Sequence, residues 1–235
     1  MLIGADYDKI EFQLFGLELL EPNAFIGDMI IAFFAFLFAY KVSKLNQTVF
    51  TKNWKIFFFL FGMLFFFGGF GHLMYNYWAI PGKYIGWFLG IITVFYIETA
   101  MLSFIKKDKL RNVLLIASKI KLVLALTGEV LVISLIDLTQ DFSVAMQIPT
   151  INSTFGLILT LVVLSYHYTK TLSPNFKFFI FSVIVMLPAV FFRALKVNIA
   201  PWFDKNDVSH LVLFIGLILY YVGVKRVADY QKTLS

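Results

Sequence analysis

Two histidines far apart in the sequence, His72 and His210, are the residues best suited to do chemistry. His210 follows Asp207 by three positions, so on a helix their side chains would share one face, and His72 would come from a neighbouring helix. Imidazole and carboxylate groups bind Zn²⁺, and three protein ligands plus one water form the usual catalytic site. His72, His210 and Asp207 are therefore the candidate ligands of a zinc ion, although the sequence has no dense signature such as H-E-x-x-H.

Three further charged residues, Asp28, Glu129 and Arg193, interrupt strongly apolar stretches. A charge at the centre of a bilayer costs roughly 2.5–3.5 kcal/mol on insertion scales, so such residues are candidates for function. Asp28 or Glu129 would act as a catalytic base, and Arg193 would hold an anionic headgroup or stabilise an oxyanion. The alternative is that Asp28 and Arg193 neutralise each other.

Simple structural roles compete with chemistry for the other polar residues. His72 could hydrogen-bond to a neighbouring carbonyl, and Asp207 could serve only the start of a helix. Glu98 is expected to be a packing or pairing residue, Lys121 to extend towards the membrane surface, and His167 to lie at the interface.

Composition places these residues in a membrane protein. Of the 235 residues, 60% are hydrophobic and only 14% are charged, whereas a soluble domain is nearer a quarter charged. Such a chain needs lipid as part of its solvent. It has no cysteine, which excludes disulfides, thiolate nucleophiles and Cys-type zinc sites. The net charge of +6 does not indicate a nucleic-acid partner, because most of the lysines lie in loops.

The elements that would position the polar residues are seven apolar segments, each near the ~20 residues that cross a bilayer as a helix. We expect an all-α membrane protein with a single seven-transmembrane-helix bundle over residues 23–235. Residues 1–22 form a short acidic segment with apolar side chains that could lie in the interface. The predicted helices are 23–40, 56–77, 84–105, 112–136, 148–168, 176–197 and 208–224.

Basic residues in the loops predict the orientation. With seven crossings, thirteen of them fall on the side of the C-terminus and four on the other side. Because cytoplasmic loops are rich in lysine and arginine, we expect the N-terminus outside and the C-terminus in the cytoplasm, with the chain in a bacterial inner membrane. An even number of helices would spoil this alternation of charge, which also favours seven.

Helix direction then places the polar residues at one depth. The second, fourth and sixth helices run outward, so His72, Glu129 and Arg193 fall in their outer halves. The first and seventh run inward, so Asp28 and His210 fall there too. Five positions on five helices thus indicate a polar cavity on the outward side.

Three short stretches resemble a group of uncharacterised bacterial seven-helix membrane proteins. That group in turn is similar to the CREST superfamily, which includes alkaline ceramidases and progestin and adiponectin receptors. The resemblance implies a seven-helix bundle with a metal site near the N-terminal side. Histidines on helices two and seven are ligands of that metal, and His72 and His210 lie on those two helices. The stretches are Glu21-Pro22-Asn23-Ala24 with Asp28, Gly68-Gly69-Phe70-Gly71-His72, and Phe203 to His210.

The chain departs from the CREST pattern at several positions. Gly68 stands where the pattern has a serine, four residues before His72. The pattern has two histidines four apart on helix seven, but Asn206 and Phe214 flank His210 at that spacing. Glu98 lies too deep to supply the carboxylate expected on the third helix. Either Asp207, Asp28 or Glu129 replaces the lost ligand, or the fold holds no metal.

Two functions are open on this evidence. The first is a CREST-like, metal-dependent hydrolase of a lipid amide or ester, with zinc activating a water. The second is a non-enzymatic membrane protein, namely a sensor or a lipid-binding or transport protein with a buried hydrogen-bond network. In both, a membrane lipid is the expected substrate or ligand.

Overall fold

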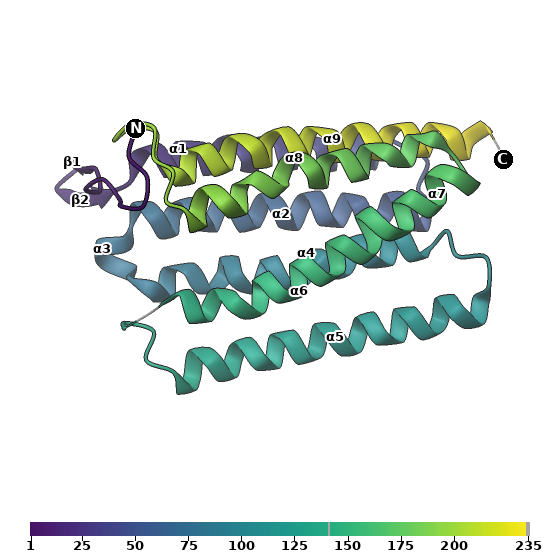
Figure 1. Ribbon diagram of the computed structural model, residues 1–235, viewed down its shortest axis with the longest axis horizontal. Coiled ribbons are helices and arrows are strands. Elements are labelled where there is room, and N and C mark those ends of the chain that lie inside the picture. Colours follow the sequence, from purple (N-terminus) through teal and green to yellow (C-terminus); the bar gives the residue numbers. More distant parts are fainter. Residues whose placement is uncertain (141, 234–235) are drawn as a thin grey trace.

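The computed structural model describes residues 1–140 and 142–233 as a bundle of long helices with a small β-hairpin at one end (Figure 1). Short 3-10 helices (η1, η2, η4) and one π-helical segment (η3) join or interrupt the α-helices. The elements are β1 (Glu11–Leu14), β2 (Leu17–Leu20), α1 (Pro22–Ser43), α2 (Val49–Leu73), α3 (Tyr75–Trp78), η1 (Ile80–Lys83), α4 (Tyr84–Leu102), α5 (Asp108–Leu135), η2 (Phe142–Met146), α6 (Gln147–Leu157), η3 (Ile158–Leu164), α7 (Ser165–Thr171), η4 (Pro174–Phe176), α8 (Lys177–Ala194) and α9 (Lys205–Thr233).

Six helical spans in the described residues are long and apolar enough to cross a membrane. The spans are α1, α2, η1 with α4, Ser143–Thr171, η4 with α8, and α9. They run side by side along the longest axis of the molecule (Figure 1). Large apolar side chains cover their outer surface; Phe33 is 62% exposed and Ile184 57% exposed. Such a surface is stable in hydrocarbon and not in water, so the chain is an all-α integral membrane protein.

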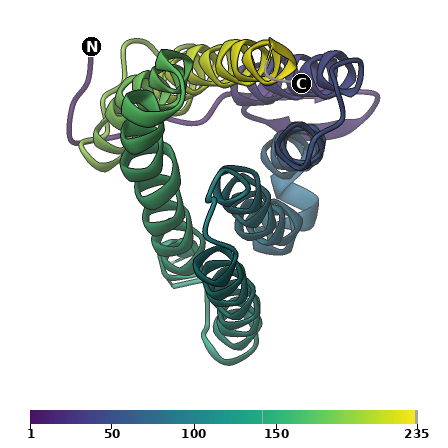
Figure 2. The ribbon, with the colours of Figure 1, turned by 90° about the vertical axis from the view of Figure 1, so that its right-hand side faces the viewer.

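Helix α5 lies where the sequence predicts a membrane helix, but it is not among the six spans of the described residues that are long and apolar enough to cross a membrane. Figure 2 shows it at the edge of the bundle, far from α1 and α9. A buried ion pair holds it to α4, because Lys121 Nζ lies 2.5 Å from Glu98 Oε1 and the Ser118 hydroxyl donates to the same carboxylate. The pairing role predicted for Glu98 is confirmed. Lys121, which the sequence predicts to extend towards the membrane surface, instead turns inward to Glu98.

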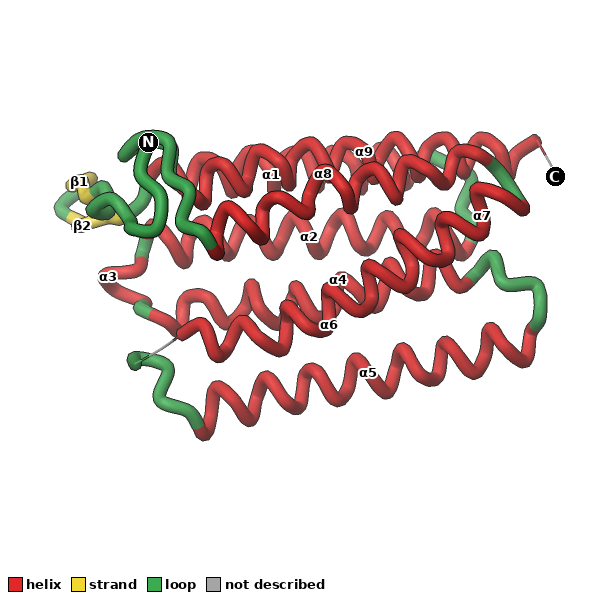
Figure 3. Tube along the Cα trace, in the orientation of Figure 1, coloured by secondary structure: helices red, strands yellow, loops and turns green. Residues whose placement is uncertain are grey.

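The N-terminal segment forms a β-hairpin that caps one end of the bundle, as the strand colours of Figure 3 make clear. Phe15 and Gly16 take left-handed backbone angles, which lets the chain turn between β1 and β2. The backbone N–H of Glu18 donates to the Tyr77 hydroxyl at 2.9 Å, and Phe15 is 95% exposed at the tip. An ordered hairpin therefore stands where the sequence predicts only an acidic surface segment.

The two ends of the bundle differ in charge. The connections α1–α2, α4–α5 and α7–α8 and the end of α9 lie opposite the hairpin (Figure 1). These connections, the helix turns next to them and the end of α9 carry the thirteen basic residues counted above. An aromatic core packs beneath them, where the rings of Trp54 and Phe179 stack with centroids 5.2 Å apart. We refer to the two ends as the hairpin end and the C-terminal end.

Candidate functional site

Glu21 and His72 form a hydrogen-bonded pair at the hairpin end. His72 Nδ1, near the end of α2, lies 2.8 Å from Glu21 Oε2, and Lys9 Nζ lies 3.2 Å from the same oxygen. Glu21 precedes α1 and is only 5% exposed. Its φ of 50° is left-handed, a conformation that costs a non-glycine residue about 1–3 kcal/mol. The hydrogen bond from its N–H to the Ile10 carbonyl, 2.9 Å, helps to hold that strained backbone.

The environment of Glu21 favours its ionised form. Burial raises the pKa of this carboxyl, but the hydrogen bond and charge of His72 and the charge of Lys9 together lower it, to about 2. The carboxylate is therefore ionised at any physiological pH, and it links the hairpin to α2.

A second pair joins α1 to α9. His210 Nε2 lies 3.1 Å from Asp28 Oδ1, and Asp28 is 3% exposed. The other ring nitrogen of His210, Nδ1, is buried and has no hydrogen-bond partner among the residues that the structure describes. It lies against Gly27, where a Cβ atom would come within 2.8 Å of it. Glycine at this position therefore lets the imidazole reach the carboxylate.

Close contact between α1 and α2 brings the two pairs to the same region. A Cβ atom at Gly69 would lie 3.0 Å from Asp28 Cβ, closer than nearly all real contacts of this kind. The glycine run before His72 thus serves helix packing, as small residues commonly do between membrane helices.

Asp207 stabilises the beginning of α9. Its Oδ2 accepts hydrogen bonds from Asn23 Nδ2 at 2.7 Å and from the Asp204 backbone N–H at 2.9 Å. Asp204 in turn accepts from the backbone N–H of Asn206 at 2.6 Å. The contacts of Asp207 are those of a helix-start carboxylate, the simpler of the two roles considered for it.

These groups, Glu21, Asp28, His72, Asp207 and His210, form what we call the hairpin-end cluster. They influence one another electrostatically, as do two cations from neighbouring elements, Arg193 of α8 and Lys83 of η1. Asp28 interacts with the charges of Arg193, Asp207, Glu21 and Lys83, and His210 interacts with those of His72 and Arg193. Four predicted site residues, Asp28, His72, Asp207 and His210, thus gather at one end.

The other two predicted site residues take different places. Arg193 lies in the last turn of α8 with an exposed side chain, and within the described residues it forms no ion pair with a carboxylate within 4 Å. Asp28 and Arg193, which the sequence suggests could neutralise each other, therefore interact through their charges and not through a direct ion pair. The position of Arg193 at a helix C-terminus, where the helix dipole stabilises a cation, makes a direct pair less necessary. Glu129 is buried in α5, and its carboxyl has no hydrogen-bond partner in the described part of the chain.

The arrangement of donors does not fit a resident zinc ion. Among residues 1–140 and 142–233, no group of three or more His, Cys, Asp or Glu side chains could hold a metal. Each histidine faces a carboxylate of its own, and the oxygens of Asp207 are occupied by Asn23 and Asp204. We therefore derive no chemistry through a metal.

Sequence reasoning missed Glu21 and Lys9 as members of the site. Glu21 was noted only within the Glu-Pro-Asn stretch that resembles other proteins. The available signal was its position directly before a helix whose first turns also carry Asn23 and Asp28. Nothing in the sequence indicated that Lys9 belongs to the site, because only the fold of the hairpin places its ammonium group next to Glu21.

The pKa of Glu21 predicts a specific acid sensitivity. A carboxyl with a pKa near 2 when folded and 4.5 otherwise stabilises the fold above pH 4.5, and this contribution is lost as pH falls towards 2. At pH 7 we expect Glu21→Gln to lower stability by roughly 1–3 kcal/mol, and the difference from the wild type to vanish near pH 2. Thermal unfolding in detergent across this range measures it. The exposed Glu18→Gln is the control, and an equal loss there would contradict the prediction.

Comparison with known proteins identifies one family. A model described as a family of unknown function, DUF6962, matches residues 24–229, which is most of the chain. No curated protein and no solved structure matches the chain. The similarity to the CREST superfamily stays a prediction from the short stretches quoted above. By the extent of the family match, the chain belongs to the DUF6962 family.

Proposed function

We propose that the chain crosses a bacterial inner membrane seven times, with the hairpin end outside and the C-terminal end in the cytoplasm. The gathering of thirteen basic residues at the C-terminal end supports this orientation. Helix α5 would be the seventh crossing, because its 28 residues are long enough and its Lys121 is neutralised by Glu98.

Single cysteines test the topology, since the chain has none of its own. We expect a membrane-impermeant maleimide applied to intact spheroplasts to label Phe15→Cys, and to label Lys109→Cys only after the membrane is opened. The opposite labelling pattern would reverse the orientation. Labelling of both positions from one side would mean an even number of crossings between them.

We further propose that the protein works through protons bound by the hairpin-end cluster and is a sensor or transporter. The observation that carries this proposal is the buried Asp28–His210 pair with its unpartnered Nδ1 atom. Ionisable groups buried in membrane helices commonly form proton relays. A proton can reach an atom this deeply buried far more easily than a lipid carbonyl can.

Charge explains how proton binding would change the structure. With its single proton on Nε2, the pair of the Asp28 carboxylate and a neutral imidazole carries one negative charge, and burial of a net charge is costly. A second proton, on Nδ1, would make the pair neutral overall, as an imidazolium held by the carboxylate. It would also break the close fit of His210 against Gly27, between α1 and α9. The charged and titratable groups around the pair are Arg193, Asp207, Glu21, Lys83 and His72.

Spin labels on α1 and α9 test the proposal. We expect the distance between labels at Ile26→Cys and Leu211→Cys, both exposed, to lengthen on acidification from neutral pH. A pair at Lys41→Cys and Lys225→Cys, at the C-terminal end, is the control and should not respond. The response should vanish in His210→Gln. Distances that do not depend on pH at the first pair would reject the proposal.

A lipid amide or ester hydrolase is the second candidate, favoured by one specific feature of the same pair. A carboxylate that holds one ring nitrogen while the other is free to take a proton is the arrangement of a general base. Substrate would have to enter beneath the hairpin. Hydrolysis of N-acyl or ester lipids by the purified protein, lost in His210→Gln, would support this candidate over proton sensing.

A further inference from the structure

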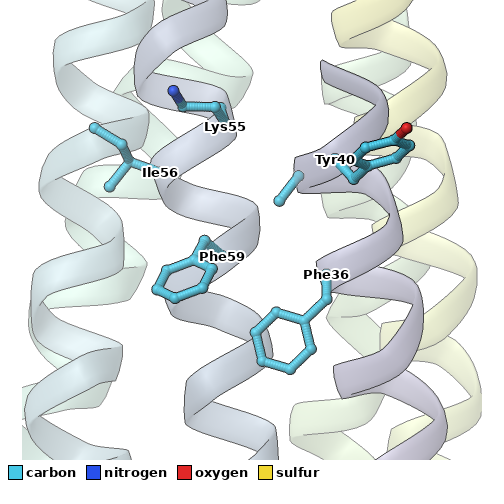
Figure 4. Close-up of a pocket in the computed structure, with 6 residues that line it drawn as sticks. Phe36, Tyr40, Lys55, Ile56 and Phe59 are labelled. Carbon is cyan, nitrogen blue, oxygen red and sulfur yellow. The ribbon is translucent and has the colours of Figure 1, made fainter. Parts of the chain in front are cut away.

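A groove on the outer surface of α1 and α2 lies near the C-terminal end of the bundle, because it is lined by the end of α1 and the first half of α2. Figure 4 shows the side chains that line it. Its volume is about 550 Å³. Tyr40 of α1 lies twelve residues beyond Asp28, which corresponds to about 18 Å along a helix. The lining residues are Phe36, Ala39, Tyr40, Lys55, Ile56 and Phe59.

The floor of the groove is apolar and its shape depends on small residues. The rings of Phe36 and Phe59 lie 5.7 Å apart, one from each helix. Phe36 fits against Gly62, where a Cβ atom would come within 2.7 Å of its ring. Ala39 leaves the middle of the groove open, and Phe59 is 50% exposed on the membrane-facing flank. An acyl chain is the ligand that suits such a surface within a bilayer.

One end of the groove is basic. Lys55 lines it and, within the described residues, has no ion pair or hydrogen bond. The ammonium group of Lys44 lies 4.9 Å from the centre of the Tyr40 ring. Residues 40–55 include two further lysines, Lys41 and Lys52, and contain no aspartate or glutamate. This charge is complementary to a phosphate group at the level of the lipid headgroups.

We propose that the groove binds an anionic phospholipid. One acyl chain lies along Phe36, Ile56 and Phe59, and the phosphate contacts Lys55 and Lys44. The proposal depends on the α1–α2 surface alone, so it stands or falls independently of the proton-binding cluster.

Lipid retention by the full chain in detergent, measured by native mass spectrometry, tests the proposal. We expect phosphatidylglycerol to bind more tightly than phosphatidylcholine with the same acyl chains. Each lysine near an anionic headgroup contributes about 1 kcal/mol, so Lys44→Ala combined with Lys55→Ala should weaken phosphatidylglycerol binding roughly tenfold or more. The matched control is Lys107→Ala with Lys109→Ala, at the same end but outside the groove, and it should leave binding unchanged.

Two further measurements separate the groove from charge alone. Ile56→Trp, which fills the groove and keeps the lysines, should reduce retention of both lipids. Inorganic phosphate at millimolar concentration should not displace phosphatidylglycerol. Equal retention of the two lipids by the wild type, an equal effect of the control pair, or displacement by phosphate alone would each overturn the proposal.

Discussion

Replacing Glu98 with leucine should destabilise the protein by about 3–5 kcal/mol, one of the two largest losses that we expect from a single substitution. The carboxylate is 3% exposed and holds Lys121 of α5 and the Ser118 hydroxyl. Without it, the ammonium group would be left inside the bundle with only the Asn152 carbonyl, 3.4 Å away. Because α5 packs at the edge of the bundle, its attachment should be lost first.

A double-mutant cycle measures this effect. Glu98→Leu and Lys121→Met should each be severely destabilising, whereas the double variant should be much closer to the wild type, because an apolar pair needs no compensating charge. Thermal unfolding in detergent gives the comparison, and Lys119→Met, an exposed neighbour, is the control. If the double variant lost as much as the two single variants together, the ion pair would not be what holds α5.

The second large effect is expected at Asp28. Asp28→Leu removes the acceptor of His210 Nε2 and leaves both ring nitrogens buried without partners, which should cost about 3 kcal/mol. Asp28→Asn retains a hydrogen-bonding side chain and should cost about 1 kcal/mol. The same unfolding measurement ranks the variants.

A compensating substitution keeps this prediction specific. Asp28→Leu combined with His210→Phe removes the polar group together with its partner, and it should recover much of the lost stability. An Asp28→Leu variant as stable as the wild type would mean that the pair contributes nothing to the packing of α1 against α9.

The helices were predictable because each apolar run is long enough to cross a bilayer. Their ends were not, since a helix continues past the hydrocarbon where its residues permit. Helix α9 extends to Thr233, beyond the expected end at 224, and α2 begins at Val49, where Thr48 caps it, instead of at 56. The hairpin was missed because two strands of four residues carry little periodic signal.

The depth of the site was predictable, but its pairing was not. Helix direction alone placed Asp28, His72 and His210 in one zone, and the structure brings them there. The choice of carboxylate for each histidine depends on helix rotation and on close packing at Gly27 and Gly69, which the sequence does not reveal without an interhelical geometry. Glu129 shows the same limit, because it lies on a helix at the edge of the bundle, apart from the cluster.

The protonation of His210 tests the central claim most directly. The chain has three histidines, so ¹⁵N spectra of histidine-labelled protein in lipid bilayers can be assigned with single His→Gln variants. At pH 7 we predict that His210 has a protonated Nε2, shared with Asp28, and a bare Nδ1, and that Nδ1 takes up a proton on acidification only while Asp28 is present. Titration of His210 that is unchanged in Asp28→Asn would contradict the account, as would metal-type shifts of both His72 and His210 that a chelator removes.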